Sequence, residues 1–543
     1  MYAVHKEIRP QVAPQDAPQV ASPDQATALP SQRSQDAPLA EPAQKRAAAL
    51  ELMKQLEARA ATRSEARRAL IDRCGRLTAR ARLSALLDAE HPYLPLYNMA
   101  SYLVDGPDPL RALPGASLLG GIGFVAGVRC VVAVDDAGIN AGVMTAKTAE
   151  KLAGLIRVAH RQGLPFVHLM DSVGPDLHKV DGTQWDALGT ALAELARKGP
   201  PVVSVLHGSA IGAVSLFAGL SDHVIAVRKE ALVMLAGAAQ VRAVTGEVAR
   251  DAALGGAELH SEVTGLVDQL ADDDGEAIQQ ARAYLASRWS QESAPTTAEP
   301  PLAVASVAPE ELAVQIADAG AVDPYKPGYG VGCQCMLARI GGHAVAILAA
   351  GDAMDPDALR KCCAFLDHAE QAGLPVLFLL NSNGFALGRQ AERGGIVRLA
   401  AQLMARVVAL RTPRIALRLG AAHGAAGFVL GGLSGALAGG VGGMDFMFSW
   451  PGSEAAVLPP QEAGRTLEQV ALRSAQRRNL ALDEKRLGAQ RADLEAHLTH
   501  QAAALVRSGQ GGDMGVIDPR DSRNVLRICL DTCAAAGKRR VNV

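Results

Sequence analysis

Aromatic residues are scarce in this chain, which contains nine Phe, seven Tyr and three Trp among 543 residues. Ala, Val, Leu and Gly must therefore fill its cores, and hydrophobic residues still make up 49% of the sequence, which is enough for large buried cores. Small side chains let helices pack closely on a sheet and leave backbone amides within reach of a ligand. Because one core rarely serves so long a chain, we expect two or three domains.

A strong net charge and a long apolar run are both missing. The formal net charge of −2 gives no electrostatic basis for a nucleic-acid partner. The sequence contains no run of about 18 apolar residues that would predict a membrane span. Its most apolar stretch, 424–443, is interrupted by many glycines. The N-terminus has charges at His5, Lys6 and Glu7 and no apolar segment of a secretory signal. We therefore expect a cytoplasmic protein.

The cysteines lack the spacing of a metal-binding framework. The eight cysteines are Cys74, Cys130, Cys333, Cys335, Cys362, Cys363, Cys529 and Cys533. Neither Cys333 with Cys335 nor the adjacent pair Cys362–Cys363 has C-x-x-C spacing. Most cysteines lie in apolar segments, which is typical of buried, reduced thiols in a cytosolic protein. The sequence therefore predicts no metal site.

Two loose stretches suggest the domain boundaries. Residues 1–45 are rich in Pro, Gln, Ala and Ser, and we expect them to form a disordered tail. A helical pattern follows as far as residue 87. Residues 291–311 are rich in Pro and Ser and are predicted to be a linker. These limits predict an N-terminal domain at 46–290 and a C-terminal domain at 312–543.

The two halves of the chain resemble each other. The segment "HRQGLPFVHLMDSVG" at 160–174 matches "EQAGLPVLFLLNSNG" at 370–384, and 201–213 matches 413–425 in the same order. Each copy begins with a hairpin-like strand pair and an amphipathic helix that ends at Gly-Leu-Pro. A buried strand, a second helix, another buried strand and a Gly/Ala-rich turn follow. Strands that alternate with helices predict an α/β protein with two largely parallel sheets.

Small residues follow the buried strands of both copies. They occupy 171–174 and 208–213 in the first copy, and 381–384 and 420–427 in the second. Ligands of α/β sheets collect at the carboxyl ends of strands, where small residues let backbone N–H groups approach a ligand oxygen. Two such amides can stabilise an enolate or a ureido oxyanion. Close helix–sheet packing would explain one such turn, whereas four at equivalent positions favour binding.

Ionisable side chains are few at these turns. His423 can polarise a ligand or can be a structural hydrogen-bonding residue. Asp171 can act as a general base or can order its own turn. Gly120–Gly123 fits neither a dinucleotide-binding nor a P-loop pattern, and no G-x-S-x-G nucleophile motif occurs. The sequence therefore favours oxyanion stabilisation by backbone amides.

Several segments in order resemble a known family. They are "GRLTARARLSALLD" (75–88), "HPYLPLYNMASYLV" (91–104), "VRKEALVMLAG" (227–237), "LGGAELHSEVTGLVDQLADDDGEA" (254–277), "FLLNSNGFALGRQAERGGI" (378–396), "SWPGSEAAVL" (449–458) and "MGVIDPRDSRNVLRICL" (514–530). From about Arg73 to its end the chain resembles the carboxyltransferase β subunits of biotin-dependent acyl-CoA carboxylases. Within that family it is most similar to the 3-methylcrotonyl-CoA and geranyl-CoA carboxylase branch.

This resemblance implies a fold, a reaction and partners. Each copy should be a crotonase-like ββα superhelix of the ClpP/crotonase type, the first binding acyl-CoA and the second carboxybiotin. The biotin would be carried by a biotin carboxylase/biotin carrier α subunit. Carboxybiotin would release CO₂, its ureido anion would deprotonate the acyl-CoA, and the enolate would capture the CO₂. Self or related β subunits would assemble as a dimer-based hexamer.

The resemblance also assigns site residues. The family's amide pairs map to Val173 and Gly174 for the thioester oxygen, and to Ala425 and Ala426 for the biotin carbonyl. The residues expected to bind substrate or biotin around them are Gly208, Ser209, Gly212, Ala213, Gly384, Phe385, His423 and Gly424.

The first copy departs from the family pattern at its turns. Val173 replaces a usual glycine and narrows the approach to the backbone, and Ile211 stands where a small residue is usual. Two alternatives therefore stay open beside the active carboxyltransferase. One is a biotin-independent decarboxylase or a crotonase-type hydratase, for which Glu230 and Glu247 would be the available carboxylates. The other is a degenerate, non-catalytic β-like subunit in a mixed carboxylase complex.

Overall fold

The computed structural model describes the chain except for residues 1–39, 67, 74, 105, 107, 176–181, 198, 290–300, 304–307, 352, 432–442, 479–482 and 542–543. Helix α1 (Ala40–Glu65) includes the last residues of the tail expected at 1–45, so the helix begins earlier than predicted. Pro42 lies in its first turn, where a missing N–H removes no intrahelical hydrogen bond. The linker expected at 291–311 lies mostly outside the described residues, and its end begins helix α11 (Pro309–Ile316).

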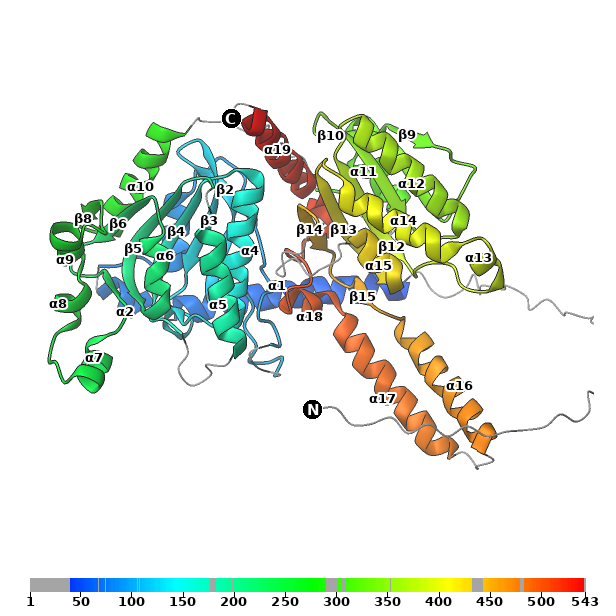
Figure 1. Ribbon diagram of the computed structural model, residues 1–543, viewed down its shortest axis with the longest axis horizontal. Coiled ribbons are helices and arrows are strands. Elements are labelled where there is room, and N and C mark those ends of the chain that lie inside the picture. The colour runs from blue at the N-terminus through cyan, green and yellow to red at the C-terminus, as the bar shows by residue number, and fades with distance from the viewer. Residues whose placement is uncertain are drawn as a thin grey trace, which may run out of the picture. The chain divides into compact units, whose positions relative to one another are not determined.

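The first repeat is built on one mixed sheet, shown in Figure 1. The strand order is β1-β2-β3-β4-β5-β6-β8, and β7 pairs with β5. The strands are β1 (Leu94–Pro95), β2 (Leu118–Val125), β3 (Val128–Asp135), β4 (Phe166–Ser172), β5 (Val202–Ile211), β6 (His223–Val227), β7 (Leu232–Met234) and β8 (Gln269–Ala271). β2 and β3 form an antiparallel hairpin, and β3 to β6 run parallel to one another.

Helices cover both faces of this sheet. The helices of this repeat are α2 (Arg68–Arg73), α3 (Ala79–Leu86), α4 (Ala146–Gln162), α5 (Gly182–Leu195), α6 (Ser215–Gly219), α7 (Ala238–Thr245), α8 (Asp251–Gly255), α9 (Ala257–Leu259) and α10 (Asp274–Arg288). Helices α4, α5 and α6 supply one apolar cluster, and α3 and α10 supply another. Helix α4 ends at Gly163, whose φ of 60° is left-handed, which confirms the Gly-Leu-Pro stop.

The second repeat repeats this architecture. Its sheet has the order β14-β13-β12-β11-β10-β9, and β15 pairs with β13. The strands are β9 (Val322–Tyr325), β10 (Cys333–Ile340), β11 (His343–Ala350), β12 (Val376–Ser382), β13 (Arg414–His423), β14 (Phe446–Ser449) and β15 (Glu454–Ala456). The helices after α11 are α12 (Pro356–Gln371), α13 (Arg389–Arg393), α14 (Ile396–Ala409), α15 (Gly424–Gly431), α16 (Pro460–Arg478), α17 (Glu484–Ala502), α18 (Ala504–Gly509) and α19 (Ser522–Val541).

The strand register shows that the two sheets are copies of one unit. Phe166 pairs with Val202 between β4 and β5, and the equivalent residues Val376 and Arg414 pair between β12 and β13. Both strand pairs also shift register at the same point, just before Ser172 in the first sheet and just before Ser382 in the second. The predicted duplication of an α/β unit is therefore confirmed.

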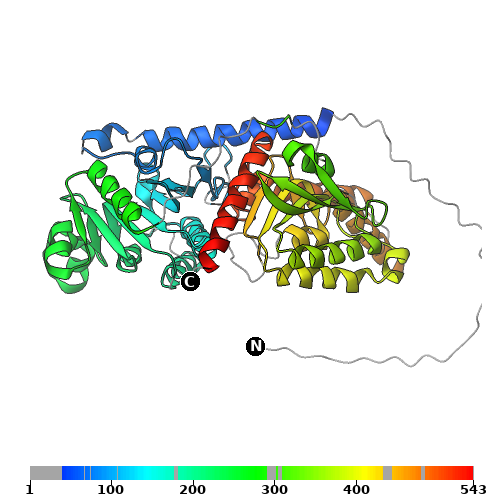
Figure 2. The same ribbon diagram turned by 90° about the horizontal axis from the view of Figure 1, so that it is seen from above.

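The C-terminal helix packs against both repeats. Figures 1 and 2 show α19 beside α4 of the first repeat and β10 of the second. Arg129 of β3 donates from Nη1 to Thr532 Oγ1 at 3.2 Å, and Arg161 of α4 donates from Nη1 to Met444 O at 2.7 Å. One apolar cluster accordingly contains residues of both repeats and of α19. Among the helices that the structure describes, none is long and apolar enough to cross a membrane.

Candidate functional site

The turn after β4 is held by one serine. Ser172 Oγ donates to Gly142 O at 2.5 Å and accepts a hydrogen bond from Gly174 N at 3.2 Å. Met144 N in turn donates to Gly174 O at 2.9 Å. Gly174 has a φ of 93°, which a residue with a side chain rarely adopts. The turn is therefore a fixed loop in which Gly174 is buried, whereas the Val173 side chain is 46% exposed.

The turn expected at 208–213 begins later than predicted. β5 continues to Ile211 because β7 pairs with its extension, Ser209 with Leu232. Gly208 and Ser209 are thus strand residues, and only Gly212 and Ala213 of the expected set lie in the turn, a short 3₁₀ helix. The sequence did not reveal β7 as a partner strand, so the extension could not be predicted.

The two turns of the first repeat lie next to each other. A Cβ built on Gly174 would come within 2.6 Å of Ile211 O. A Cβ built on Gly212, whose φ is 74°, would lie 3.7 Å from Pro175 Cδ. Backbone groups that follow two neighbouring strands are therefore brought to one place, as expected for the carboxyl ends of parallel strands.

A buried cluster of charged side chains stands behind this turn. We call it the Asp171 cluster; its members are Arg76, Arg82, Asp171, His207 and Asp274. Arg82 Nη1 lies 2.9 Å from Asp171 Oδ2, and Arg82 Nε lies 2.9 Å from Asp274 Oδ2. His207 Nδ1 lies 2.7 Å from Asp274 Oδ1, and Arg76 also pairs with Asp171. Asp171 is therefore held by two guanidinium groups, which favours its turn-ordering role over that of a general base.

The electrostatics of the cluster favour an ionised Asp274. Burial would raise the pKa of Asp274, but the hydrogen bond from His207 and the charge of Arg82 hold that pKa well below its usual range. Burial and the nearby Arg82 lower the pKa of His207. Gly208 completes this packing, since a Cβ there would collide with Asp171 Oδ1 and Arg76 Nη2. The absence of a side chain at Gly208 thus makes room for the ion pair.

The second repeat has the same turn without the charges. Asn381 occupies the position of Asp171, and its Oδ1 accepts from Ala421 N at 2.9 Å. Gly384 has a φ of 115° and donates from its N to Ser382 Oγ at 3.2 Å. Met354 N donates to Gly384 O at 3.0 Å, as Met144 does in the first repeat. Equivalent turns are therefore ordered by ion pairs in one repeat and by a neutral amide in the other.

The second turn of this repeat opens directly into a helix. β13 runs to His423, and α15 begins at Gly424, whose φ is 64°. Ala425 is exposed and Ala426 is buried, and both lie in the first turn of α15. The first N–H groups of a helix have no intrahelical partner, so these amides can donate hydrogen bonds to a ligand oxygen. Gly424 also lies close to Gly384, since a Cβ on it would be 4.0 Å from Gly384 Cα.

Two side chains flank this helix start. His423 is 5% exposed, and neither of its ring nitrogens has a hydrogen-bond partner within the described part of the chain. Burial lowers its pKa, although the charges of Glu454 and Glu462 act in the opposite direction. A neutral imidazole here offers one donor and one acceptor to a ligand. Phe385, half-buried after the Gly384 turn, packs against the apolar cluster of α12 and α14.

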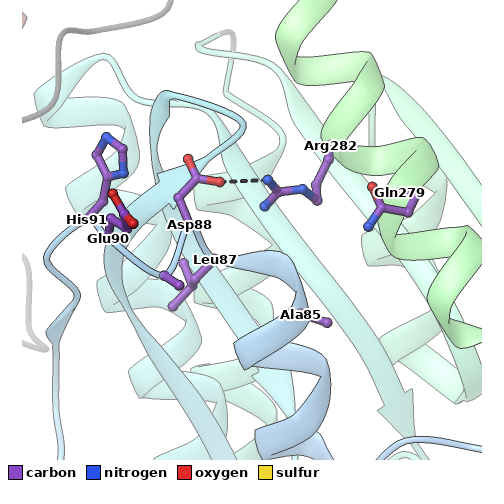
Figure 3. Close-up of a pocket in the computed structure, with 8 residues that line it drawn as sticks. Ala85, Leu87, Asp88, Glu90, His91, Gln279 and Arg282 are labelled. Atoms are coloured by element: carbon purple, nitrogen blue, oxygen red, sulfur yellow. Dashed lines mark hydrogen bonds and ion pairs between the residues drawn. The ribbon is translucent and has the colours of Figure 1, made fainter.

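A cavity of about 450 Å³ lies elsewhere in the first repeat. Figure 3 shows Asp88 and Arg282 pointing toward each other in its lining, with Asp88 Oδ1 2.7 Å from Arg282 Nη2. Gly127 N donates to Asp88 Oδ2 at 2.7 Å, so the cavity adjoins the β2–β3 hairpin turn. That turn is at the amino end of β3, whereas the candidate turns follow carboxyl ends. The cavity therefore takes no part in the candidate site.

Comparisons with known proteins agree with the motif order in the sequence. The family pattern described as "Carboxyl transferase domain" matches residues 72–541. A Mycobacterium tuberculosis protein named "Probable biotin-dependent acyl-coenzyme A carboxylase beta2 subunit" is 32% identical over 481 residues, covering 85% of this chain and 88% of that protein. The biotin-dependent 3-methylcrotonyl-coenzyme A carboxylase beta1 subunit of the same organism is 28% identical over 483 residues, covering 85% and 89%.

A solved structure extends the similarity to the fold. The crystal structure of the P. aeruginosa geranyl-CoA carboxylase β subunit matches with a TM-score of 0.81 and 29% identity, covering 94% of this chain and 97% of that one. The predicted architecture of two tandem crotonase-like domains is thereby confirmed. The chain belongs to the carboxyl transferase family and is a carboxyltransferase of the acyl-CoA carboxylase β-subunit type.

Proposed function

We propose that this carboxyltransferase takes its carboxyl group from carboxybiotin carried by a separate biotin carboxylase/biotin carrier α subunit. It then moves the group to an acyl-CoA through an enolate held by backbone amides. The duplicated turn carries this proposal, because each repeat brings two glycine-containing turns together where strands end. Relatives named as β subunits of biotin-dependent carboxylases support the choice of donor.

The first repeat is proposed to hold the thioester. The N–H groups of Val173 and Gly174 would bind the thioester oxygen and then the enolate oxygen. Gly174 N already donates to Ser172 Oγ, so the ligand would share that donor. Gly212 and Ala213 would line the same place, and Gly208 and Ser209 would support it from the end of β5. Each well-aligned amide donor in such a site contributes about 10²–10³-fold to the rate.

The second repeat is proposed to hold the biotin. The N–H groups of Ala425 and Ala426 would bind the ureido carbonyl, with His423 beside them and Gly384, Phe385 and Gly424 around them. The base in this scheme is the ureido nitrogen that CO₂ has left, so no side-chain base is required. The ion pairs of Asp171 support this, because its carboxylate is held by Arg76 and Arg82.

An amide can be removed from this site with little cost to the fold. Ala425 lies in the first turn of α15, where proline is tolerated because the missing N–H has no intrahelical partner. Ala425→Pro should lower the rate of carboxyl transfer from the biotinylated partner about 100-fold or more. Ala425→Ser, which keeps the N–H, is the matched control. Equal rates in the two variants would refute the role of this amide.

A non-catalytic β-like subunit is the competing proposal, and the exposed isopropyl group of Val173 favours it. Biotin-independent decarboxylation is the other alternative. Purification from the native host separates the three, because the leading proposal requires a biotinylated protein to accompany the chain. Its absence would contradict that proposal. Activity that persists after avidin treatment would favour the decarboxylase, and a complex active only through another β subunit would favour the non-catalytic role.

The assembly and location are proposed from the family resemblance. Self or related β subunits would form a dimer-based hexamer, and the complex would work in the cytoplasm. The chain would consist of an acyl-CoA-binding domain at 46–290 and a biotin-binding domain at 312–543, as the sequence predicts.

A further inference from the structure

Three thiols meet in the core of the second repeat. Cys333 and Cys335 lie two residues apart on β10 and therefore point to the same face of the sheet. Cys362 faces them from α12, which packs on β10. The three sulfur atoms all lie within 4.8 Å of one another. Each side chain is at most 1% exposed, so the cluster is sealed from solvent.

The first repeat shows that the fold does not need sulfur at this place. The first residue pair of its hairpin is Leu118 with Asp135, and the equivalent pair in the second repeat is Cys333 with Ala350. The residues equivalent to the three cysteines are Leu118, Gly120 and Leu152. Leu118 and Leu152 are buried in an apolar cluster. The same architecture is thus filled by hydrocarbon in one copy and by three thiols in the other.

A buried lysine makes the thiol cluster electrostatically distinct. Lys361 is 1% exposed, and the described residues offer its Nζ one hydrogen bond, to Lys326 O at 3.5 Å. Its counterpart Lys151 donates to Leu118 O at 2.6 Å and to Gly115 O at 3.2 Å. A buried ammonium group needs a compensating partner, and the nearby sulfur atoms can supply a negative charge.

We propose that Cys333, Cys335 and Cys362 form a binding site for a soft, thiophilic metal ion, Zn²⁺ or Cu⁺. Thiolates select these ions, and metal–sulfur bonds of about 2.3 Å place three sulfurs about 4 Å apart. Three thiolates around Zn²⁺ carry one negative charge, which Lys361 neutralises. Cu⁺ with two thiolates and one thiol has the same net charge. Zn²⁺ binding releases three thiol protons to solvent and Cu⁺ binding releases two, and either ion links β10 to α12.

Metal content of the purified chain tests this site. The protein is produced in medium supplemented with zinc or with copper, dialysed against a weak chelator, and analysed for bound metal. We expect about one equivalent per chain and slow loss to a strong chelator, because the site is sealed. Retention of zinc alone or copper alone identifies the ion. Failure to retain either metal would overturn the proposal.

Neighbouring cysteines provide the control. Cys362→Ala should lose the metal, whereas Cys363→Ala, a change at the adjacent and nearly buried position of α12, should keep it. Cys335→Ala serves as a second variant if Cys362→Ala does not fold. Cobalt loading adds a further measurement, since a thiolate-to-metal charge-transfer band should be present in the parent and in Cys363→Ala. Equal metal content in all variants would mean binding at other groups and would refute the site.

Discussion

Replacing Arg82 is expected to destabilise the first repeat strongly. Its side chain is 2% exposed and contacts two carboxylates, Asp171 Oδ2 and Asp274 Oδ2, each at 2.9 Å. Removing one partner of a buried ion pair costs about 3–5 kcal/mol, because the other charge stays buried without compensation. Asp171 would keep Arg76, and Asp274 would keep His207 Nδ1 and Leu77 N. Arg82→Ala should therefore lower the free energy of unfolding by about 3 kcal/mol, the lower end of this range.

Urea unfolding followed by circular dichroism measures this loss. Arg80→Ala is the matched control, because Arg80 is an exposed residue of the same helix, α3. Exposed substitutions of this kind change stability by about 0.5 kcal/mol or less. If the free energies of unfolding of Arg82→Ala and Arg80→Ala differed by less than about 1 kcal/mol, the Asp171 cluster would not stabilise the turn. Carboxyl transfer should fall with Arg82→Ala under conditions where the protein is still folded, because the Ser172–Gly174 turn loses its support.

Three further outcomes follow from the same site. Gly208→Ala should lower stability by about 1–3 kcal/mol, because the added Cβ overpacks against Asp171. The control, Gly189→Ala, lies in open space on α5 and should raise stability by about 0.5–1 kcal/mol. Equal melting temperatures of the two variants would contradict this. Because the pKa of Asp274 is depressed on folding, its stabilising contribution should be complete above about pH 4 and decline as the pH falls further; an Asp274→Asn variant with an equally steep acid transition would disprove this. Val173→Gly should raise the rate of carboxyl transfer if its side chain obstructs the acyl pocket, and an unchanged rate would favour an altered substrate instead.

Much of the fold was predictable because the two halves of the sequence repeat the same order of strands, helices and turns. The amphipathic helix predicted to end at Gly-Leu-Pro is α4 in the first repeat and α12 in the second. The turn at 208–213 was predicted less well, since a strand's length depends on whether a neighbour pairs with it. β7 comes more than twenty residues after the start of the β5 extension, and its three residues carry no signal of their own.

The chemistry behind the first turn was not predictable from spacing. Arg76, Arg82, His207 and Asp274 are separated from Asp171 by between 36 and 103 positions, and only the folded chain brings them together. The arginines in "GRLTARAR" supported the family resemblance without revealing their partner. The thiol cluster was missed for the same reason, because Cys362 comes from a different element than Cys333 and Cys335.

The position of α19 has a consequence for how the chain is synthesised. Leu526, Cys529 and Leu530 of this helix belong to the same apolar cluster as α4, which leaves the ribosome more than 350 residues earlier. Until α19 emerges from the ribosome, the first repeat must expose the apolar surface that this helix later covers. Nascent chains of this protein should therefore depend on chaperones until α19 is made, and premature termination after residue 521 should yield an aggregating product rather than a half-active one.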